Sequence, residues 1–589
     1  MAKHPSLANA LNATKNTILR FPLETIAAIF ATIFAILLID EKGDSVEKLY
    51  VKIIMCCSLC LVLFLSASLF FAATKKNNIL RFATSLLLGG FVIVFVLSFG
   101  EEITTVESQQ FVVLNIALHL MVSFAGFLPK TYNQDEFWEF NKQLFLRILI
   151  AGLYSAVLYG GLSLAILATD KLFNVEINEK IYGYLFFIIA GIFNTIFFLN
   201  GVPETNNSEK PLLLSYPNGL KNFTQYVLLP LISIYLAILI CYETKILVTL
   251  SLPVGWVSYL VLVFAIFGIL SFLLVHPIAT EKGNLWIRTF NRWFYFLLIP
   301  LLGLLFWAIL YRIQLYGFTH ERYYVFLLSL WLTVVVAYFL IKKQHKIKFI
   351  PISMCLAAIF SIAGPQSANS ISKNSQLSRF EVYMHKIEKE KLNFEQEQDL
   401  SSIINFLEKN YGVKILLPYT KNKLNALLKK DKNPNSSQIM EALGLQYHSD
   451  YDRKDKDNTE FYYYGNEKNQ NTVENIHGYD MSFILSKNND FECTDCIKID
   501  GVSYSIKSAE KEYGIDLQIN QDIIPLKIID YVNKNSSFEY ENSDKEIAQK
   551  IELPKYDIII TYISLNGKKV GTKKILDQYQ IKVMLKIKK

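Results

Sequence analysis

The stretch that decides the fold is KKQHKIK, residues 342–348, which separates two strongly apolar runs, YYVFLLSLWLTVVVAYFLI (323–341) and FIPISMCLAAIFSIAG (349–364). Lysines occupy four of its seven positions, and no acid accompanies them. About 20 apolar helical residues cross the hydrocarbon core of a bilayer, and short connectors rich in Lys and Arg stay on the cytoplasmic side. The lysine run therefore predicts a cytoplasmic loop between two membrane-spanning helices.

Similar apolar runs fill the chain up to residue 364, and the rest of the 589 residues is ordinary mixed sequence. The mean hydropathy of the whole chain is +0.28, which is high for a soluble protein. The pattern predicts a polytopic α-helical membrane bundle of about 11 spans, followed by a soluble α+β C-terminal domain. We expect the spans at 21–39, 50–73, 79–99, 110–128, 144–169, 181–200, 223–242, 254–275, 293–311, 323–341 and 349–364.

The distribution of charge predicts the orientation of the chain. If residues 1–20 form a cytoplasmic segment, the inner loops hold 18 Lys and Arg residues and the outer loops hold 8. Residues 21–364 are then the transmembrane domain, and residues 365–589 lie outside the cytoplasm. The last 225 residues carry 33 basic and 33 acidic side chains. Because a nucleic-acid binder carries a basic surplus on a soluble face, we expect no nucleic-acid partner.

The predicted secondary structure of the C-terminal domain changes along its length. Residues 378–445 show helical patterns, and residues 478–589 show mainly alternating, strand-like patterns. Asp500-Gly501 and Asn566-Gly567 are dipeptides typical of hairpin turns. This order of helices and then strands predicts an α+β domain.

One polar stripe inside the predicted membrane domain is a candidate site. In the fourth run Asn115, His119 and Ser123 follow one another at spacings of four, so they share one face of a helix. A histidine at this depth is costly unless it faces the bundle interior or water. The stripe therefore indicates either a proton relay or solute-pathway lining, or a neutral histidine that hydrogen-bonds between helices.

Two smaller patterns carry weaker hypotheses. Asp40 and Asp44 lie in the first outer loop, where an acid could serve an enzyme that uses a lipid-linked sugar, although a short acidic loop is usually only solvated. Cys493 and Cys496 form CTDC, a candidate disulfide, and a free thiol pair is the alternative. No ligand set at metal-site spacing accompanies the cysteines, so we expect no metal and no cofactor.

Several segments carry a family resemblance. EKPLLLSYPNGLKNFTQYVLLPLISIYLAILICYETKILVTLSLPVGWVSYLV (209–261) and WIRTFNRWFYFLLIPLL (286–302) are followed by RYYVFLLSLWL, KFIPIS and HGYDMSFIL. Together they resemble the bacterial multi-pass membrane family named domain of unknown function 4153. The resemblance implies a multi-span membrane domain in a bacterial inner membrane plus a C-terminal domain, and it implies no catalytic residues.

Three functions follow as hypotheses. The first is a non-enzymatic envelope protein that binds, senses or has a structural role, with the lipid bilayer as its surroundings and an envelope protein or glycan as partner of the C-terminal domain. The second is a solute transporter or channel that uses the Asn115–His119–Ser123 stripe. The third is a membrane glycosyltransferase-like enzyme with a lipid-linked donor. The common catalytic motifs do not occur in a fitting context, which favours a role without catalysis.

Overall fold

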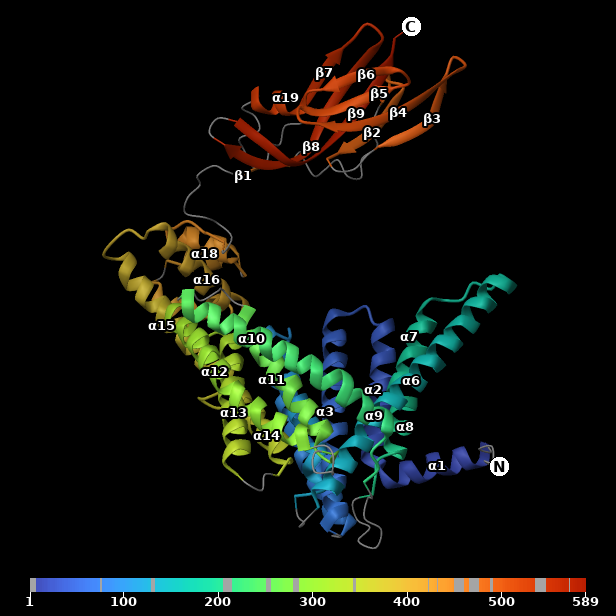
Figure 1. The fold of residues 1–589 in the computed structure, drawn as a ribbon, viewed down its shortest axis with the longest axis vertical. Coiled ribbons are helices and arrows are strands. Elements are labelled where there is room, and N and C mark those ends of the chain that lie inside the picture. The colour runs from blue at the N-terminus through green and yellow to red at the C-terminus, as the bar shows by residue number, and fades with distance from the viewer. Residues whose placement is uncertain are drawn as a thin grey trace. The chain divides into compact units, whose positions relative to one another are not determined.

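The computed structural model divides the chain into two compact units, Met1–Asp450 and Tyr451–Lys589 (Figure 1). We describe each unit by itself. The structure describes residues 7–74, 77–128, 133–204, 214–249, 256–278, 285–342, 346–421, 423–431, 433–449, 460–464, 476–487, 491–534, 547–570 and 573–588. The middle of the lysine run, residues 343–345, lies outside these ranges.

The described part of the first unit is helical. Its elements are α1 (Leu7–Arg20), α2 (Pro22–Asp40), α3 (Asp44–Thr74), α4 (Asn78–Leu97), α5 (Thr105–Ala125), α6 (Gln134–Phe173), α7 (Lys180–Phe187), η1 (Ile188–Phe193), α8 (Asn194–Asn200), α9 (Asn218–Phe223), η2 (Thr224–Leu228), α10 (Leu229–Thr249), α11 (Trp256–Val275), α12 (Leu285–Tyr316), α13 (His320–Ile341), α14 (Phe349–Ile362), α15 (Ala368–Ile387), α16 (Phe394–Tyr411), η4 (Val413–Tyr419), α17 (Asn425–Lys430) and α18 (Ser436–Ala442).

Within the described ranges, nine helices are long and apolar enough to cross a membrane. They are Pro22–Asp40, Asp44–Thr74, Asn78–Leu97, Thr105–Ala125, Gln134–Phe173, Lys180–Asn200, Asn218–Thr249, Arg292–Tyr316 and His320–Ile341. Two further predicted spans correspond to shorter apolar helices, Leu260–Val275 and Phe349–Ile362. The helical membrane character is confirmed, and the predicted number of about 11 spans is not.

Two hydrophobic cores hold the apolar helices together. One core joins α3, α4, α5 and the start of α6, and the other joins α10 to α13. Tyr216 and Leu273 pack against both cores. The indole N–H of Trp138 donates to the carbonyl oxygen of Leu273 at 2.7 Å, and its ring stacks on Tyr216. These aromatic contacts join the two halves of the bundle.

A buried polar network lies beside this joint. Glu139 on α6 is only 1% exposed. Its carboxylate accepts hydrogen bonds from Lys142 Nζ at 2.9 Å, from Gln143 Nε2 at 2.8 Å and from the backbone N–H of Ser215 at 3.0 Å. A buried charge is tolerated when it is paired and hydrogen-bonded, so this network ties the chain before α9 to α6.

Helices α15 to α18 form a small helical cap with its own core, in which Phe380, Leu400 and Ile404 are fully buried. The cap contacts the α12–α13 corner. There Gly317 has φ = +68°, and a Cβ at this position would lie 2.8 Å from Ser375 Oγ. Only glycine adopts this conformation readily. Because of these contacts the cap belongs to the first unit, Met1–Asp450.

Two hydrogen-bonded contacts fix the cap to this corner. Gln376 Nε2 on α15 donates to the carbonyl oxygens of Tyr316 and Phe318, at 2.9 and 2.8 Å. The Tyr411 hydroxyl on α16 lies 3.1 Å from Nε2 of the buried His320. The backbone of the corner is thus paired with side chains of the cap, as a buried turn requires.

The described part of the second unit contains two antiparallel sheets and one short helix (Figure 1). One sheet has the order β1-β8-β9-β2, with β7 also paired to β8, and the other has the order β3-β4-β5-β6. Their elements are β1 (Glu460–Tyr464), β2 (Met481–Ser486), β3 (Glu492–Ile499), β4 (Val502–Lys511), β5 (Gly514–Ile519), β6 (Asp522–Leu526), α19 (Ile528–Lys534), β7 (Ala548–Glu552), β8 (Tyr556–Val570) and β9 (Lys573–Ile587).

The two predicted hairpin turns have different outcomes. Asp500 and Gly501 connect β3 to β4 with φ values of +49° and +83°, as a tight hairpin turn requires, and this prediction is confirmed. Asn566 and Gly567 lie inside β8, so the prediction of a turn there is wrong. The strand continues through this dipeptide because β8 is paired with β9 both before and after it.

Candidate functional site

Two irregularities in one strand pair create a polar surface on the second unit. The pairing of β8 with β9 shifts register between Tyr562 and Ser564 and again between Asn566 and Gly567. Three residue pairs lie between the two shifts: Ser564 with Gln580, Leu565 with Tyr579, and Asn566 with Gln578. Bulges of this kind reorient side chains and are common beside binding sites.

Side chains alternate across this segment. Leu565 and Tyr579 are buried in the core between the two sheets. Gln578 and Gln580 are exposed, and Ser564 and Asn566 are half-buried. Ser486 at the end of β2 is the register partner of Gln580. We name the polar face the set Ser486, Ser564, Asn566, Gln578 and Gln580.

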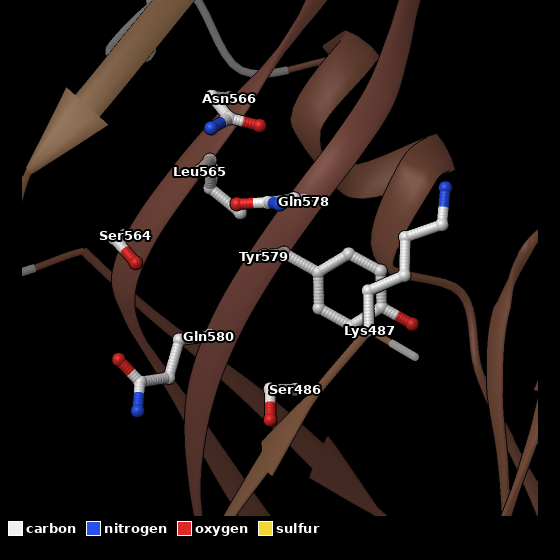
Figure 2. A pocket seen from close by; sticks show the side chains of 8 residues that line it. All are labelled: Ser486, Lys487, Ser564, Leu565, Asn566, Gln578, Tyr579 and Gln580. Carbon is white, nitrogen blue, oxygen red and sulfur yellow. The ribbon is translucent and has the colours of Figure 1, made fainter. Parts of the chain in front are cut away.

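The polar face borders a cavity of about 400 Å³, which is also lined by Lys487, Leu565 and Tyr579 (Figure 2). No hydrogen bond to another described residue is formed by the side chains of the polar face. The carbonyl oxygen Oδ1 of Asn566 is moreover buried. Buried polar atoms in native proteins are nearly always paired, so this oxygen is an exception among the described residues.

The other two polar side chains at the cavity are engaged within the protein. Lys487 Nζ donates to the carbonyl oxygen of Leu576 at 2.7 Å and lies 3.9 Å from a carboxylate oxygen of Glu510. The Tyr579 hydroxyl donates to the carbonyl oxygen of Gly514 at 3.5 Å, and burial raises the pKa of Tyr579 to about 12. The tyrosine therefore stays neutral, and the lysine charge is partly compensated.

The predicted Asn115–His119–Ser123 stripe lies on the outward side of α5. The His119 ring is exposed, and its Nδ1 lies 2.9 Å from the carbonyl oxygen of Asn115. Ser123 donates to the carbonyl oxygen of Leu120 on its own helix. All three residues border a shallow depression of about 450 Å³ on the surface of the helix. The structure thus brings the three residues together.

The two candidate acids, Asp40 and Asp44, are engaged in ion pairs. Asp40 accepts hydrogen bonds from Lys180 Nζ at 2.7 Å and from the Tyr184 hydroxyl at 2.7 Å. Asp44 accepts one from Lys48 Nζ at 2.8 Å, one turn along α3. The first pair connects the end of α2 to α7, and the second lies within the first turns of α3.

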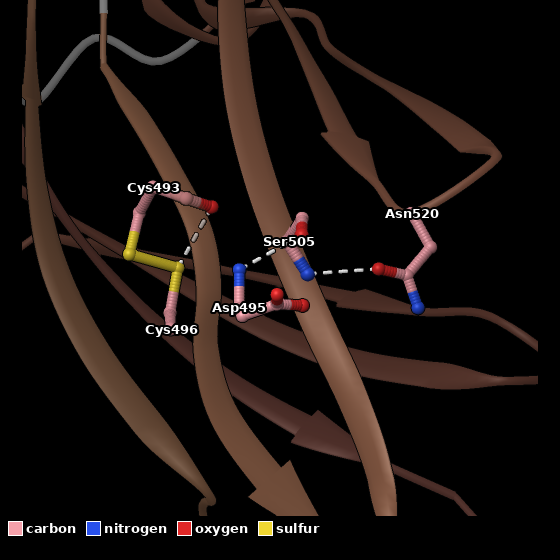
Figure 3. Close-up of a disulfide and its surroundings, with 5 residues drawn as sticks. All are labelled: Cys493, Asp495, Cys496, Ser505 and Asn520. Atoms are coloured by element: carbon pink, nitrogen blue, oxygen red, sulfur yellow. Dashed lines mark hydrogen bonds between the residues drawn. A yellow bond between two sulfur atoms is a disulfide. The ribbon is translucent and has the colours of Figure 1, made fainter.

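Cys493 and Cys496 are joined by a disulfide in β3 (Figure 3). Their Cα atoms are 5.6 Å apart, and the bond spans a register shift between Cys493 and Ile497. Within the shift the backbone N–H of Asp495 donates to Ser505 Oγ at 3.0 Å, and Asp495 has φ = +52°. The disulfide therefore closes a bulge next to the β3–β4 ladder.

A buried acid in the first unit was not predicted as a site. Glu24 on α2 is fully buried, accepts a hydrogen bond from Ser68 on α3, and has its other oxygen 4.0 Å from Arg81 Nη2 on α4. A carboxylate in a first helical turn predicts only a favourable dipole interaction. Its contacts with α3 and α4 depend on packing that residue spacing does not reveal.

The residues described in the structure contain no group of three His, Cys, Asp or Glu side chains placed to hold a metal ion. The polar face likewise contains only amides and hydroxyls. Such groups donate and accept hydrogen bonds but do not titrate near neutral pH. The arrangement is chemically suited to holding a neutral polar ligand.

Long apolar helices in the first unit define the class of the protein, a multi-pass helical membrane protein. The family model "Domain of unknown function (DUF4153)" matches residues 24–393, and the chain belongs to this family. The family match covers most of the first unit and does not reach the sheets.

One curated relative is similar over part of its length. The uncharacterized protein PM1469 of Pasteurella multocida (strain Pm70) is 24% identical over 267 residues, which make up 44% of this chain and 43% of that protein. The chain thus spans less than half the length of this relative. No solved structure matches the chain.

Proposed function

We propose that this protein is a bacterial inner-membrane protein that binds a ligand of the cell envelope through its sheet unit and catalyses no reaction. The polar face carries the proposal. Its five uncharged side chains form no hydrogen bond to other described residues, yet they gather at one cavity. The amides of Gln578 and Gln580 are exposed and not engaged within the protein, so they are available to exchange bound water for a ligand.

Two observations support an extracytoplasmic position for the sheet unit. The excess of Lys and Arg in alternate loops favours a cytoplasmic N-terminus and an exported C-terminal region. The Cys493–Cys496 disulfide suits an oxidising compartment, since thiols are kept reduced in the cytosol. Charge and cysteine chemistry are independent, and both favour the same side of the membrane.

A role in binding also fits the groups that the cavity offers. Catalysis by proton transfer or nucleophilic attack requires a titratable group near the reacting atoms. The titratable side chains at this cavity are Lys487 and Tyr579, and both are hydrogen-bonded to the backbone. The remaining amides and hydroxyls orient a ligand without changing it.

Cysteine labelling in cells tests the position of the sheet unit. We expect Ala509→Cys, an exposed position on β4, to react with a membrane-impermeant maleimide in spheroplasts. The matched variant Ala8→Cys, exposed on α1, should react only after lysis. If Ala509→Cys also requires lysis, the proposed function is wrong.

Labelling of the purified full-length protein tests binding at the polar face. We expect soluble material extracted from the envelope to slow the reaction of Ser564→Cys with the same reagent. Ser482→Cys, an exposed serine on β2 outside the cavity lining, is the matched control and should react at an unchanged rate. Equal rates for Ser564→Cys with and without extract would contradict ligand binding at this site.

A further inference from the structure

We infer that the ligand of the polar face is a neutral oligosaccharide; this inference rests on the proposed function and specifies its ligand. The cavity of about 400 Å³ lies within the range of about 300–1,000 Å³ that is usual for small-molecule sites. The chemistry and arrangement of its five free side chains select the ligand class.

The free side chains are ordered in two rows across the sheet (Figure 2). One row crosses three strands, because Ser486 pairs with Gln580 and Gln580 pairs with Ser564. The second row consists of Gln578 and Asn566. Neighbouring strands are about 5 Å apart, so each step along a row is comparable to the width of one sugar ring. The rows therefore present hydrogen-bonding groups at a spacing that suits successive hydroxyls.

The bonding capacity of these side chains matches a sugar. Each amide offers two donors and an acceptor, and each hydroxyl offers both functions. A sugar hydroxyl also donates and accepts, so it can pair with either kind of group.

Charge at the cavity argues against an ionic ligand. The polar face carries no charged side chain, and the ammonium group of Lys487 is directed to Leu576 and Glu510. Phosphate and carboxylate ligands are normally recognised by Arg, Lys or clustered backbone N–H groups. The described lining of the site does not provide such a cluster of cations, so a neutral ligand fits it best.

The sheet pairing argues against a peptide added as an extra strand. Such a peptide uses the free backbone groups of an edge strand. Four of the five polar-face residues lie on β8 and β9, and both strands are paired on two sides there, whereas Ser486 lies on the edge strand β2. The two central strands therefore present only side chains to a ligand, and side-chain hydrogen bonds suit the hydroxyls of a sugar.

Calorimetric titration of the full-length protein in nanodiscs tests the inference. The probes are chitotetraose and maltotetraose as neutral glycans, tetragalacturonate as an acidic glycan, and tetra-alanine as a peptide. We expect saturable binding of at least one neutral glycan and none of the other two probes. The variant Gln578→Ala/Gln580→Ala should weaken that binding about 10-fold or more, since each lost neutral hydrogen bond reduces affinity about 2- to 10-fold.

Gln518→Ala on the other sheet is the matched control and should bind as wild type does. Gln578 and Gln580 are both exposed, so their truncation leaves the fold intact, and unchanged thermal melting verifies this. Binding of tetra-alanine or tetragalacturonate alone overturns the glycan inference and leaves a ligand site in place. Failure of all four probes also overturns it, and the labelling experiments then decide the proposed function separately.

Discussion

The Glu139 network and the polar face both consist of polar side chains, but the first is paired within the protein and the second is not. At Glu139 the carboxylate is buried and each oxygen is hydrogen-bonded to a neighbour in the bundle. On the polar face the amides and hydroxyls lie beside a cavity without partners among the described residues. The difference teaches that hydrogen-bond pairing, rather than polarity, separates groups that build the fold from groups that remain available to a ligand.

The largest expected effect concerns the paired network. Glu139→Ala should destabilise the protein by about 3–5 kcal/mol, because it leaves the nearly buried Lys142 charge without its partner. Unfolding of the purified protein in detergent, followed by tryptophan fluorescence, measures this change. Glu136→Ala on the same helix is the control, with an expected change within about 0.5 kcal/mol. Equal effects of the two substitutions would remove the structural role assigned to Glu139.

Two histidines provide the next contrast. His320 is buried and hydrogen-bonded to Tyr411 of the cap, whereas His119 is exposed on α5. We expect His320→Ala to cost about 1–3 kcal/mol, since it leaves the Tyr411 hydroxyl with one partner fewer and opens a gap. His119→Ala should change stability by less than about 0.5 kcal/mol. Thermal unfolding of both variants measures the two losses of stability. A larger loss for His119→Ala than for His320→Ala would contradict the prediction.

His119 also separates the binding hypothesis from the transport hypothesis. If α5 lines a solute pathway, His119→Ala should change flux through the protein in proteoliposomes, with a different dependence on pH. Under the proposed binding function, the variant keeps the ligand affinity of the wild type. A flux that disappears with this substitution would favour transport.

A smaller effect is expected from pH at the sheet unit. Asp522 accepts hydrogen bonds from the Tyr556 hydroxyl at 2.8 Å and from Lys555, and these donors hold the pKa of Asp522 below its usual value. A lowered pKa in the folded state gives stability that is present above the unfolded pKa of about 4 and is lost as pH falls below it.

The measurement is the melting temperature of wild type and Asp522→Asn at several pH values. We expect wild type to be the more stable near neutral pH, and the difference to shrink as the pH falls from about 5 to about 3. A constant difference in melting temperature over this range would show that the carboxylate charge of Asp522 does not contribute to stability.

The smallest expected effect on stability is at the polar face itself. Gln578→Ala should change the free energy of unfolding by less than about 0.5 kcal/mol, because the side chain is exposed and makes no described hydrogen bond. Chemical unfolding of the full-length protein measures this. A loss as large as that at Glu139 would mean that Gln578 serves the fold, and the contrast between the two regions would then fail.

Much of the fold could be predicted from residue patterns. Long apolar runs predicted the helices of the first unit, because a run without a polar face has few other stable arrangements in a bilayer. Alternation predicted the strands after residue 478, and Asp500-Gly501 predicted a turn that the structure contains. These features depend on local chemistry.

The candidate site depends instead on pairing between distant segments. The polar face exists because β8 and β9 shift register twice, and no local pattern reveals where a bulge lies. Asn566-Gly567 has the composition of a turn, yet strand pairing keeps it extended. The spacing of Asn115, His119 and Ser123 placed them on one face of the helix. Because the helix is apolar all round, its sequence did not reveal whether that face points into the bundle or outward.

The most direct test of ligand binding outside the membrane is the labelling rate of Ser486→Cys in intact cells. This position lies on the polar face, so the rate reports both its side of the membrane and its occupancy. We expect slow reaction with an impermeant maleimide in intact cells and faster reaction in spheroplasts washed free of envelope material. The same rate in both preparations, or reaction only after lysis, would contradict the account.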